Sequence, residues 1–176
     1  GRSAISVMAK LIDNVEDFSD VERERTYRVG VINGGNFVNV IPTECHADVL
    51  CVAPTPEAFA EVQRKMSSLT SPDPDVRLVV ESGPIRPLFA MHQATEELYD
   101  VARRVARDVG LDLGHGQFGG GSDGNFTGAL GIPTLDGLGV CGDGVHTKQE
   151  HLLISSLVPR ARLFAGLLEA LSERNR

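Results

Sequence analysis

Residues 44–52 (ECHADVLCV) constrain the fold of this 176-residue chain more than any other feature. The segment alternates as a strand with one buried face does, because successive side chains of a strand point to opposite faces. The face expected to be buried carries Cys45, Ala47, Val49 and Cys51. Leu50 falls on the opposite, polar face, where it is the one apolar misfit.

Further elements surround this strand. Residues 27–33 (YRVGVIN) predict another strand, with Val29 and Val31 on the face of Tyr27. A helix should follow Thr55, a good N-cap residue with a proline directly after it. Its apolar stripe is Phe59, Val62, Met66 and Leu69.

Two more elements complete the first half. Residues 76–81 (VRLVVE) predict a strand, and residues 3–12 predict a helix. The inward side chains of that helix would be Ile5, Met8 and Ile12, and residues 13–26 would be a polar connection. The order helix, strand, strand, helix, strand is typical of a two-layer α+β sandwich of ferredoxin-like type that lacks its first strand.

Prolines and glycine between residues 82 and 87 indicate a domain boundary. We therefore expect domains at 1–85 and 86–176. The second domain should hold a helix over 92–109, with Ala94, Leu98, Val101, Val105 and Val109 inward. A last helix should start from a cap at Ser155 or Ser156. Its predicted inward stripe is Leu157, Ala161, Phe164, Leu168 and Leu171.

Composition excludes several classes of protein. The net charge of −7 makes nucleic acid an improbable partner, and no apolar run reaches membrane-span length. The three cysteines are an odd number without a CxxC motif, which favours a reducing, cytoplasmic setting. The first twelve residues lack the apolar core of a signal peptide.

The stretch from Gly119 to His146 looks like the rim of a site, because two glycine-rich loops frame a short helix and a short apolar strand. A GxGxxG match ends at Gly119, but it does not open a βαβ unit. Ser122 and Asp123 lack the GxSxG elbow of a serine hydrolase. The simpler interpretation is that Asp123 caps the helix and Ser122 bonds locally.

The sequence allows more than one role for each of two further side chains. His146 lies in a glycine-flanked loop and could be a metal ligand, a general base or a surface residue. No HxH or HExxH pair accompanies it, so a complete zinc site is hard to build within this sequence. Arg86 could bind a carboxylate or be an ordinary surface arginine.

Two longer segments carry a family resemblance. GGGSDGNFTGALGIPTLDGLGVCGDGVHTKQEHL resembles the C-terminal part of the glutamate carboxypeptidase branch of the aminoacylase-like, two-zinc metallopeptidases. GVINGGNFVNVIPTECHADV resembles the lid, or dimerisation, domain of that family. The resemblance implies an α/β (α+β) chain: a ferredoxin-like lid at 1–85, incomplete at its N-terminus, and then a C-terminal α/β piece of a zinc-peptidase catalytic domain at 86–176.

The resemblance also implies a function. The family binds two divalent ions, usually zinc, and hydrolyses the amide bond of N-acyl amino acids or dipeptides with metal-activated water. His146 matches the last metal ligand of the family. The substrate-binding positions are matched by Asn39, Arg86, Gly121 and Ser122. Asp123 matches a structural neighbour of that loop.

The departures from the family limit what this chain could do alone. The other metal ligands and the catalytic glutamate belong to a part of the family sequence that these residues do not include, so no catalytic residue is expected here. A lid histidine that stabilises the oxyanion should fall just before Gly1. Leu50 stands where the family commonly has an arginine, which weakens strict glutamate specificity.

We therefore expect a portion of an amidohydrolase or exopeptidase whose isolated chain is inactive. The expected partners are a small carboxylate-bearing amide and a second copy of the chain, paired through the lid domain and residues 3–12. Two alternatives remain: a non-catalytic ferredoxin-like module for dimerisation or small-molecule binding, and a split enzyme completed by a separate chain.

Overall fold

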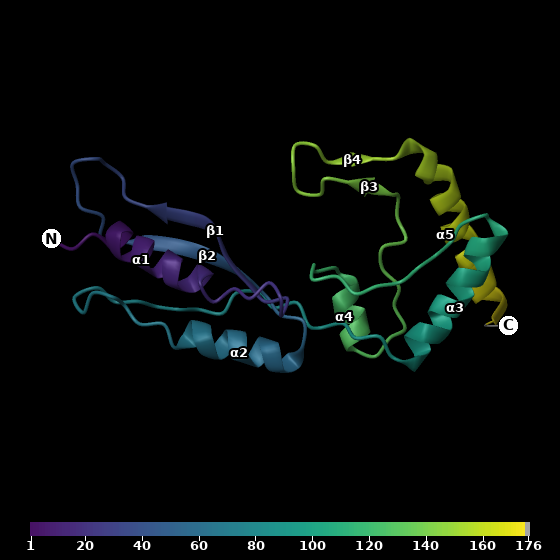
Figure 1. The fold of residues 1–176 in the computed structure, drawn as a ribbon, viewed down its shortest axis with the longest axis horizontal. Coiled ribbons are helices and arrows are strands. Elements are labelled where there is room, and N and C mark those ends of the chain that lie inside the picture. Colours follow the sequence, from purple (N-terminus) through teal and green to yellow (C-terminus); the bar gives the residue numbers. More distant parts are fainter. Residues whose placement is uncertain (175–176) are drawn as a thin grey trace. The chain divides into compact units, whose positions relative to one another are not determined.

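A computed structural model describes residues 1–174 of the chain. The chain is α/β, with helices and two small antiparallel sheets, and it divides into two compact units, Gly1–Ile85 and Arg86–Arg176 (Figure 1). No helix within the described residues has the length and apolar character needed to cross a membrane.

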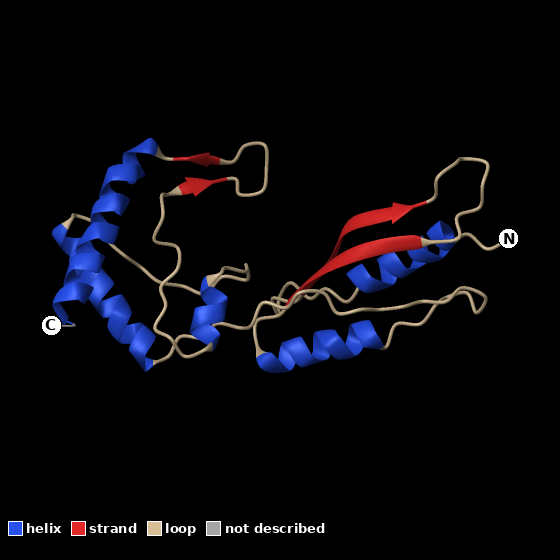
Figure 2. Cartoon of the chain, turned by 180° about the vertical axis from the view of Figure 1, so that it is seen from behind, coloured by secondary structure: helices blue, strands red, loops and turns tan. Residues whose placement is uncertain are grey.

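Unit 1 contains α1 (Ala4–Glu16), β1 (Thr26–Gly34), β2 (Cys45–Val52) and α2 (Pro56–Ser67). The two strands form an antiparallel hairpin, shown in red in Figure 2. The predicted start of α2 is confirmed: the side chain of Thr55 accepts a hydrogen bond from the Ala58 amide, and Pro56 is the first helical residue.

The core of unit 1 lies between the helices and one face of the hairpin. Val15, Tyr27 and Val62 are its buried residues. Its partly buried members are Phe18, Val49, Cys51, Ala53, Met66 and Leu69. The alternation predicted for β2 is confirmed, because Val49 and Cys51 face this core while Leu50 is 65% exposed.

A bulge in β1 changes the face of one predicted residue. The register shifts between Val29 and Val31, so that Val31 pairs with Asp48 and Ile32 pairs with Ala47. Directly opposed residues share a face of the sheet. The prediction that Val31 lies on the Tyr27 face is therefore wrong, because an extra residue in a strand reverses the alternation beyond it.

The inward face of α1 also differs from the prediction. The buried residues are Ala4, Val7, Leu11 and Val15, whereas Ile5 is 37% exposed. The helix continues through residues 13–16, which were expected to be a polar connection. Val15 packs in the core with Tyr27, and this contact selects the face of the helix.

The strand predicted at residues 76–81 is not formed. The last strand of a ferredoxin-like sheet pairs with the first strand. Within the described residues the sheet of unit 1 consists of β1 and β2, and neither stands in the place of that first strand. Residues 76–81 therefore remain without ladder hydrogen bonds in the structure described.

Unit 2 contains α3 (Gln93–Asp108), α4 (Gly124–Ala129), β3 (Gly142–Asp143), β4 (His151–Leu152) and α5 (Ile154–Arg174). The short helix expected in the glycine-rich stretch is α4. The short apolar strand expected after it is absent from the described residues, and the pairing of β3 with β4 occurs further along the chain.

The core of unit 2 forms where α3 and α5 pack together. Val101, Ala102 and Leu167 are its buried centre, and the predicted inward position of Val101 is confirmed. The partly buried members are Leu113, Leu135, Leu138, Ala170 and Leu171. On α3, Ala102 and Ala106 are fully buried, although neither belongs to the predicted stripe. Of that stripe, only Val101 is among the buried core residues.

The packing face of α5 is not the predicted one. Leu163 and Leu167 are buried, whereas Leu157, Phe164 and Leu168 are exposed. A Cβ on Gly166 would lie 2.7 Å from Val105 Cγ1, so the helices meet at a glycine. The helix also begins at Ile154, before either predicted cap, and the Ser156 hydroxyl instead accepts a hydrogen bond from the Cys141 amide at 2.9 Å.

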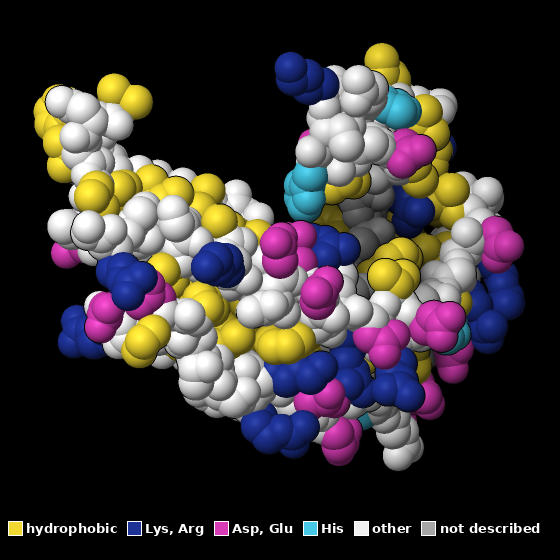
Figure 3. Space-filling view, turned by 60° about the vertical axis from the view of Figure 1, so that its left-hand side comes forward, with side chains coloured by type: hydrophobic (Ala, Val, Ile, Leu, Met, Phe, Trp, Pro, Cys, Tyr) yellow, Lys and Arg dark blue, Asp and Glu magenta, His cyan; other side chains and the backbone are white. Residues whose placement is uncertain are grey.

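Charged side chains of both signs are mixed on the surface. On the face drawn in Figure 3, the described Lys and Arg side chains lie among Asp and Glu side chains. A group of this kind joins α2 to the start of β1: Glu61 of α2 pairs with Arg25, and its Oε1 is 3.4 Å from Lys65 Nζ. Partial burial alone would raise the pKa of Glu61, but Arg25, Lys65 and Arg64 together lower it.

Replacing Glu61 by Gln should destabilise the chain at neutral pH but not in acid. A carboxyl with a lowered pKa in the folded state contributes stability above its unfolded pKa, and that stability is lost as the pH falls below about 4. Urea unfolding midpoints at pH 7 and pH 3 test this, with Glu22→Gln on an exposed turn as the control. A difference from the wild type that is equal at both pH values would contradict the prediction.

Replacing Gly166 by Leu should lower the free energy of unfolding by about 1–3 kcal/mol, the usual cost of overpacking a well-filled contact. The larger side chain has to displace Val105. The matched control is Ala165→Leu, one residue earlier on an exposed position of α5. Thermal or chemical denaturation measures both, and equal stability of the two variants would contradict this packing face.

Candidate functional site

Arg86, Gly121 and Asp123 come together in unit 2. The arginine side chain lies across Gly121 so closely that a Cβ there would be 2.7 Å from Arg86 Cδ. Its Nη1 is 3.4 Å from the Asp123 Oδ1, and the two side chains are 49% and 95% exposed. Surface pairs of this kind contribute little stability, about 0–1 kcal/mol. The guanidinium is therefore accessible, and a ligand carboxylate could replace the carboxylate of Asp123.

Ser122 organises the loop that precedes α4. Its Oγ accepts a hydrogen bond from the Gly124 amide at 3.0 Å, and its amide donates to Asn125 Oδ1 at 2.9 Å. The interpretation that Ser122 bonds locally is confirmed. The prediction that Asp123 caps the helix is wrong, because its side chain makes no capping hydrogen bond. Its carboxylate is paired with Arg86 instead.

Two contacts that the sequence analysis missed join α4 to the segment after Arg86. Asn125 Nδ2 donates to the Pro87 carbonyl at 2.8 Å. A Cβ on Gly128 would lie 2.1 Å from Phe89 Cδ2, so the phenyl ring fills the space beside that glycine. A glycine inside a helix is unfavourable unless close packing requires it, and Gly128 was the available signal.

His146 lies in the loop between β3 and β4. Gly142 permits this hairpin, because a Cβ there would be 2.2 Å from the backbone oxygen of His151. The backbone of His146 is in the left-handed region, with φ of 64°, and its amide lies 3.3 Å from the Glu150 Oε2 that accepts its hydrogen bond. A non-glycine residue with this conformation is uncommon and often marks a functional constraint. The imidazole is exposed.

The residues described here do not complete a metal site. No group of three or more His, Cys, Asp or Glu residues within 1–174 is placed to hold an ion. A zinc site requires three or four ligands. The exposed imidazole of His146 has the donor chemistry of one such ligand.

The site residues predicted from the sequence fall in both units. Asn39 is exposed in unit 1, in a turn closed by the Val40 amide and the Phe37 carbonyl. Arg86, Gly121 and Ser122 form one cluster in unit 2. Among the described residues, no hydrogen bond or ion pair links His146 to that cluster.

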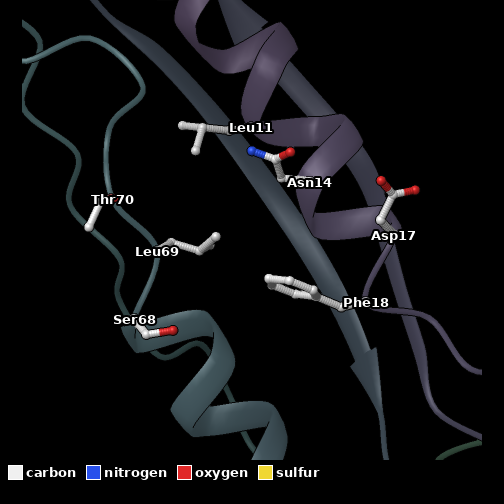
Figure 4. A pocket seen from close by; sticks show the side chains of 7 residues that line it. All are labelled: Leu11, Asn14, Asp17, Phe18, Ser68, Leu69 and Thr70. Carbon is white, nitrogen blue, oxygen red and sulfur yellow. The ribbon is translucent and has the colours of Figure 1, made fainter.

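A shallow pocket of about 420 Å³ lies elsewhere in unit 1. Its apolar side chains are Leu11 on α1 and Phe18 and Leu69 in the segments after α1 and α2 (Figure 4). Asn14 and Asp17 are also part of the lining. None of the predicted site residues lines this pocket. No nucleophilic side chain in its lining is hydrogen-bonded to a basic side chain.

Comparisons with known proteins place this geometry in a family. Residues 9–170 match the peptidase family M20/M25/M40. The uncharacterized protein YqjE of Bacillus subtilis (strain 168) is 29% identical over 172 residues, which cover 96% of this chain and 46% of that protein. Carboxypeptidase G2 of Pseudomonas sp. (strain RS-16) is 25% identical over 173 residues, which cover 96% of this chain and 41% of that enzyme.

Solved structures agree with this assignment. A tripeptidase from Staphylococcus aureus superposes with a TM-score of 0.68 at 25% identity, over 97% of this chain and 46% of that structure. The aminopeptidase PepT from Bacillus cereus shares the fold, with a TM-score of 0.62 at 24% identity over 97% of this chain and 46% of its own. This chain thus spans less than half the length of these relatives. The chain belongs to the peptidase family M20/M25/M40.

Proposed function

We propose that this chain is part of a zinc-dependent exopeptidase or amidohydrolase that cleaves N-acyl amino acids or dipeptides with a free carboxylate. The observation that carries the proposal is the accessible guanidinium of Arg86 on Gly121, already paired with the carboxylate of Asp123. A guanidinium binds a carboxylate through charge-assisted hydrogen bonds. The relatives named as a carboxypeptidase and a tripeptidase support a peptide-like substrate.

Within this proposal the predicted site residues have separate roles. Arg86, Gly121 and Ser122 form the wall that receives the substrate carboxylate, and Asn39 of the lid reaches the substrate. His146 would provide one ligand to a pair of divalent ions, and the described residues form no group of three or more His, Cys, Asp or Glu that could complete the coordination. The ions would acidify the attacking water and polarise the amide carbonyl. No catalytic step is assigned to the residues described here.

Two further expectations accompany the proposal. The lid pairs with a second copy of the chain, with α1 near the contact. The protein works in a reducing compartment such as the cytoplasm, since Cys45, Cys51 and Cys141 are free thiols in the structure. The alternative is a non-catalytic ferredoxin-like module for dimerisation or small-molecule binding. Such a module would need no complete metal cluster, and residues 1–174 contain none.

Replacing Arg86 by Ala in the native protein that carries this chain should raise KM for substrates with a free carboxylate. We expect a change of about tenfold to a hundredfold, the effect of losing a charge-assisted hydrogen bond. Substrates whose carboxylate is converted to a carboxamide should show little change. Arg104→Ala, on an exposed position of α3, is the matched control. An equal effect on both substrate types would refute carboxylate binding by Arg86.

The 176-residue chain by itself should hydrolyse no N-acyl amino acid above background, even when zinc is added, because it supplies one metal ligand of the three or four required. Its zinc binding should be weak and should fall further in His146→Ala. Calorimetric titration and an amide-hydrolysis assay test this. Hydrolysis by the zinc-loaded chain would show that the catalytic assignment is wrong. If the native protein is purified without bound metal and has no hydrolase activity, that result would favour the alternative of a non-catalytic ferredoxin-like module.

A further inference from the structure

The amide of Asn125 connects two segments that are distant in sequence. Its Nδ2 donates to the Pro87 carbonyl at 2.8 Å, and its Oδ1 accepts from the Ser122 amide at 2.9 Å. The two bonds use opposite ends of the same planar group and are partly buried. One side chain therefore fixes the distance between the residue that follows Arg86 and the residue that follows Gly121.

A second contact joins the same side of α4 to the segment after Arg86. Asn125 and Gly128 are three residues apart, so both lie on the same side of the helix. Pro87 and Phe89 are two residues apart in the segment opposite, and Gly128 receives the ring of Phe89. Residues three apart on a helix have Cβ atoms about 5–6 Å apart, and two residues of extended chain advance by about 6–7 Å, so the two spacings match. The segment at 87–89 is held at two points on α4.

The position of Arg86 depends on this attachment. A residue before a proline is restricted to extended backbone conformations, and Arg86 precedes Pro87. Its own side chain contacts are a half-exposed ion pair with Asp123 and packing on a glycine. Such contacts are weak, so anchoring the next peptide group is what aligns the guanidinium with the loop.

We propose that Asn125 is a positioning residue for carboxylate recognition: it holds the side chain of Arg86 against the backbone of Gly121. The inference rests on the proposed function, because it concerns the carboxylate that Arg86 would bind. Asn125 does not touch the ligand. It acts through the Pro87 carbonyl, and it sets how well the site distinguishes a carboxylate from a carboxamide.

The test compares two matched probes, N-acetylalanine and N-acetylalaninamide, which differ in the charge of the C-terminal group. NMR titration of the 176-residue chain measures both dissociation constants, and NOEs between Arg86 Hδ and Gly121 Hα report the geometry. Asn125→Ala removes both hydrogen bonds. Asn125→Asp keeps an acceptor for the Ser122 amide but cannot donate to Pro87. Thr127→Ala removes hydrogen bonds of the same helix that do not reach residues 86–89.

We expect Asn125→Ala and Asn125→Asp to lower the preference for the carboxylate by about tenfold and to abolish the NOE, whereas Thr127→Ala changes neither. In an Arg86→Ala background, Asn125→Ala should have no further effect on the preference, because residues that act as a unit are not additive. A variant that only loosened the fold would weaken both probes equally.

Three results would overturn the inference: an unchanged carboxylate preference in Asn125→Ala, a persisting NOE between Arg86 and Gly121, or an additive effect in the double variant. If Asn125→Ala does not fold, Asn125→Asp decides by the same readouts. If the wild-type chain prefers neither probe, the proposed carboxylate site fails, and the NOE alone still decides whether Asn125 positions Arg86.

Discussion

The close approach of the Arg86 side chain to Gly121 is the constraint on which the candidate site depends. The aliphatic part of the arginine occupies the space that a Cβ would take. The guanidinium then lies beside the loop with its charge exposed, and Asp123 pairs with it instead of capping α4. The same type of contact recurs at Gly128, which receives Phe89. Gly121 and Gly128 are therefore places where the side chains of other segments pack.

The predictions that succeeded rest on local chemistry. The N-cap at Thr55, the proline after it and the alternation of β2 each involve residues that are neighbours along the chain, so their geometry follows from the backbone itself. The resemblance of the glycine-rich stretch to a peptidase family is also confirmed, because residues 9–170 match that family. The roles that it implies for Arg86 and Gly121 stay predictions.

The predictions that failed depended on distant partners. On α5 two stripes of apolar residues compete, and Gly166 selects the one that meets α3. On α1 the contact of Val15 with Tyr27 selects the face. Residues 76–81 have strand-like side chains, but a strand requires a neighbour to receive its hydrogen bonds. The periodicity of apolar residues along a helix shows which of its faces are apolar, but it does not show which of those faces another segment covers.

The sequence by itself determined the order of most elements, the cap of α2 at Thr55 and the residue types that chemistry requires, because these depend on neighbouring residues. Tertiary structure alone decided that Asn125 binds the Pro87 carbonyl, 38 positions away, and that the bulge in β1 turns Val31 away from the core. Such outcomes follow from packing and hydrogen bonding between segments whose distance in space no local pattern specifies.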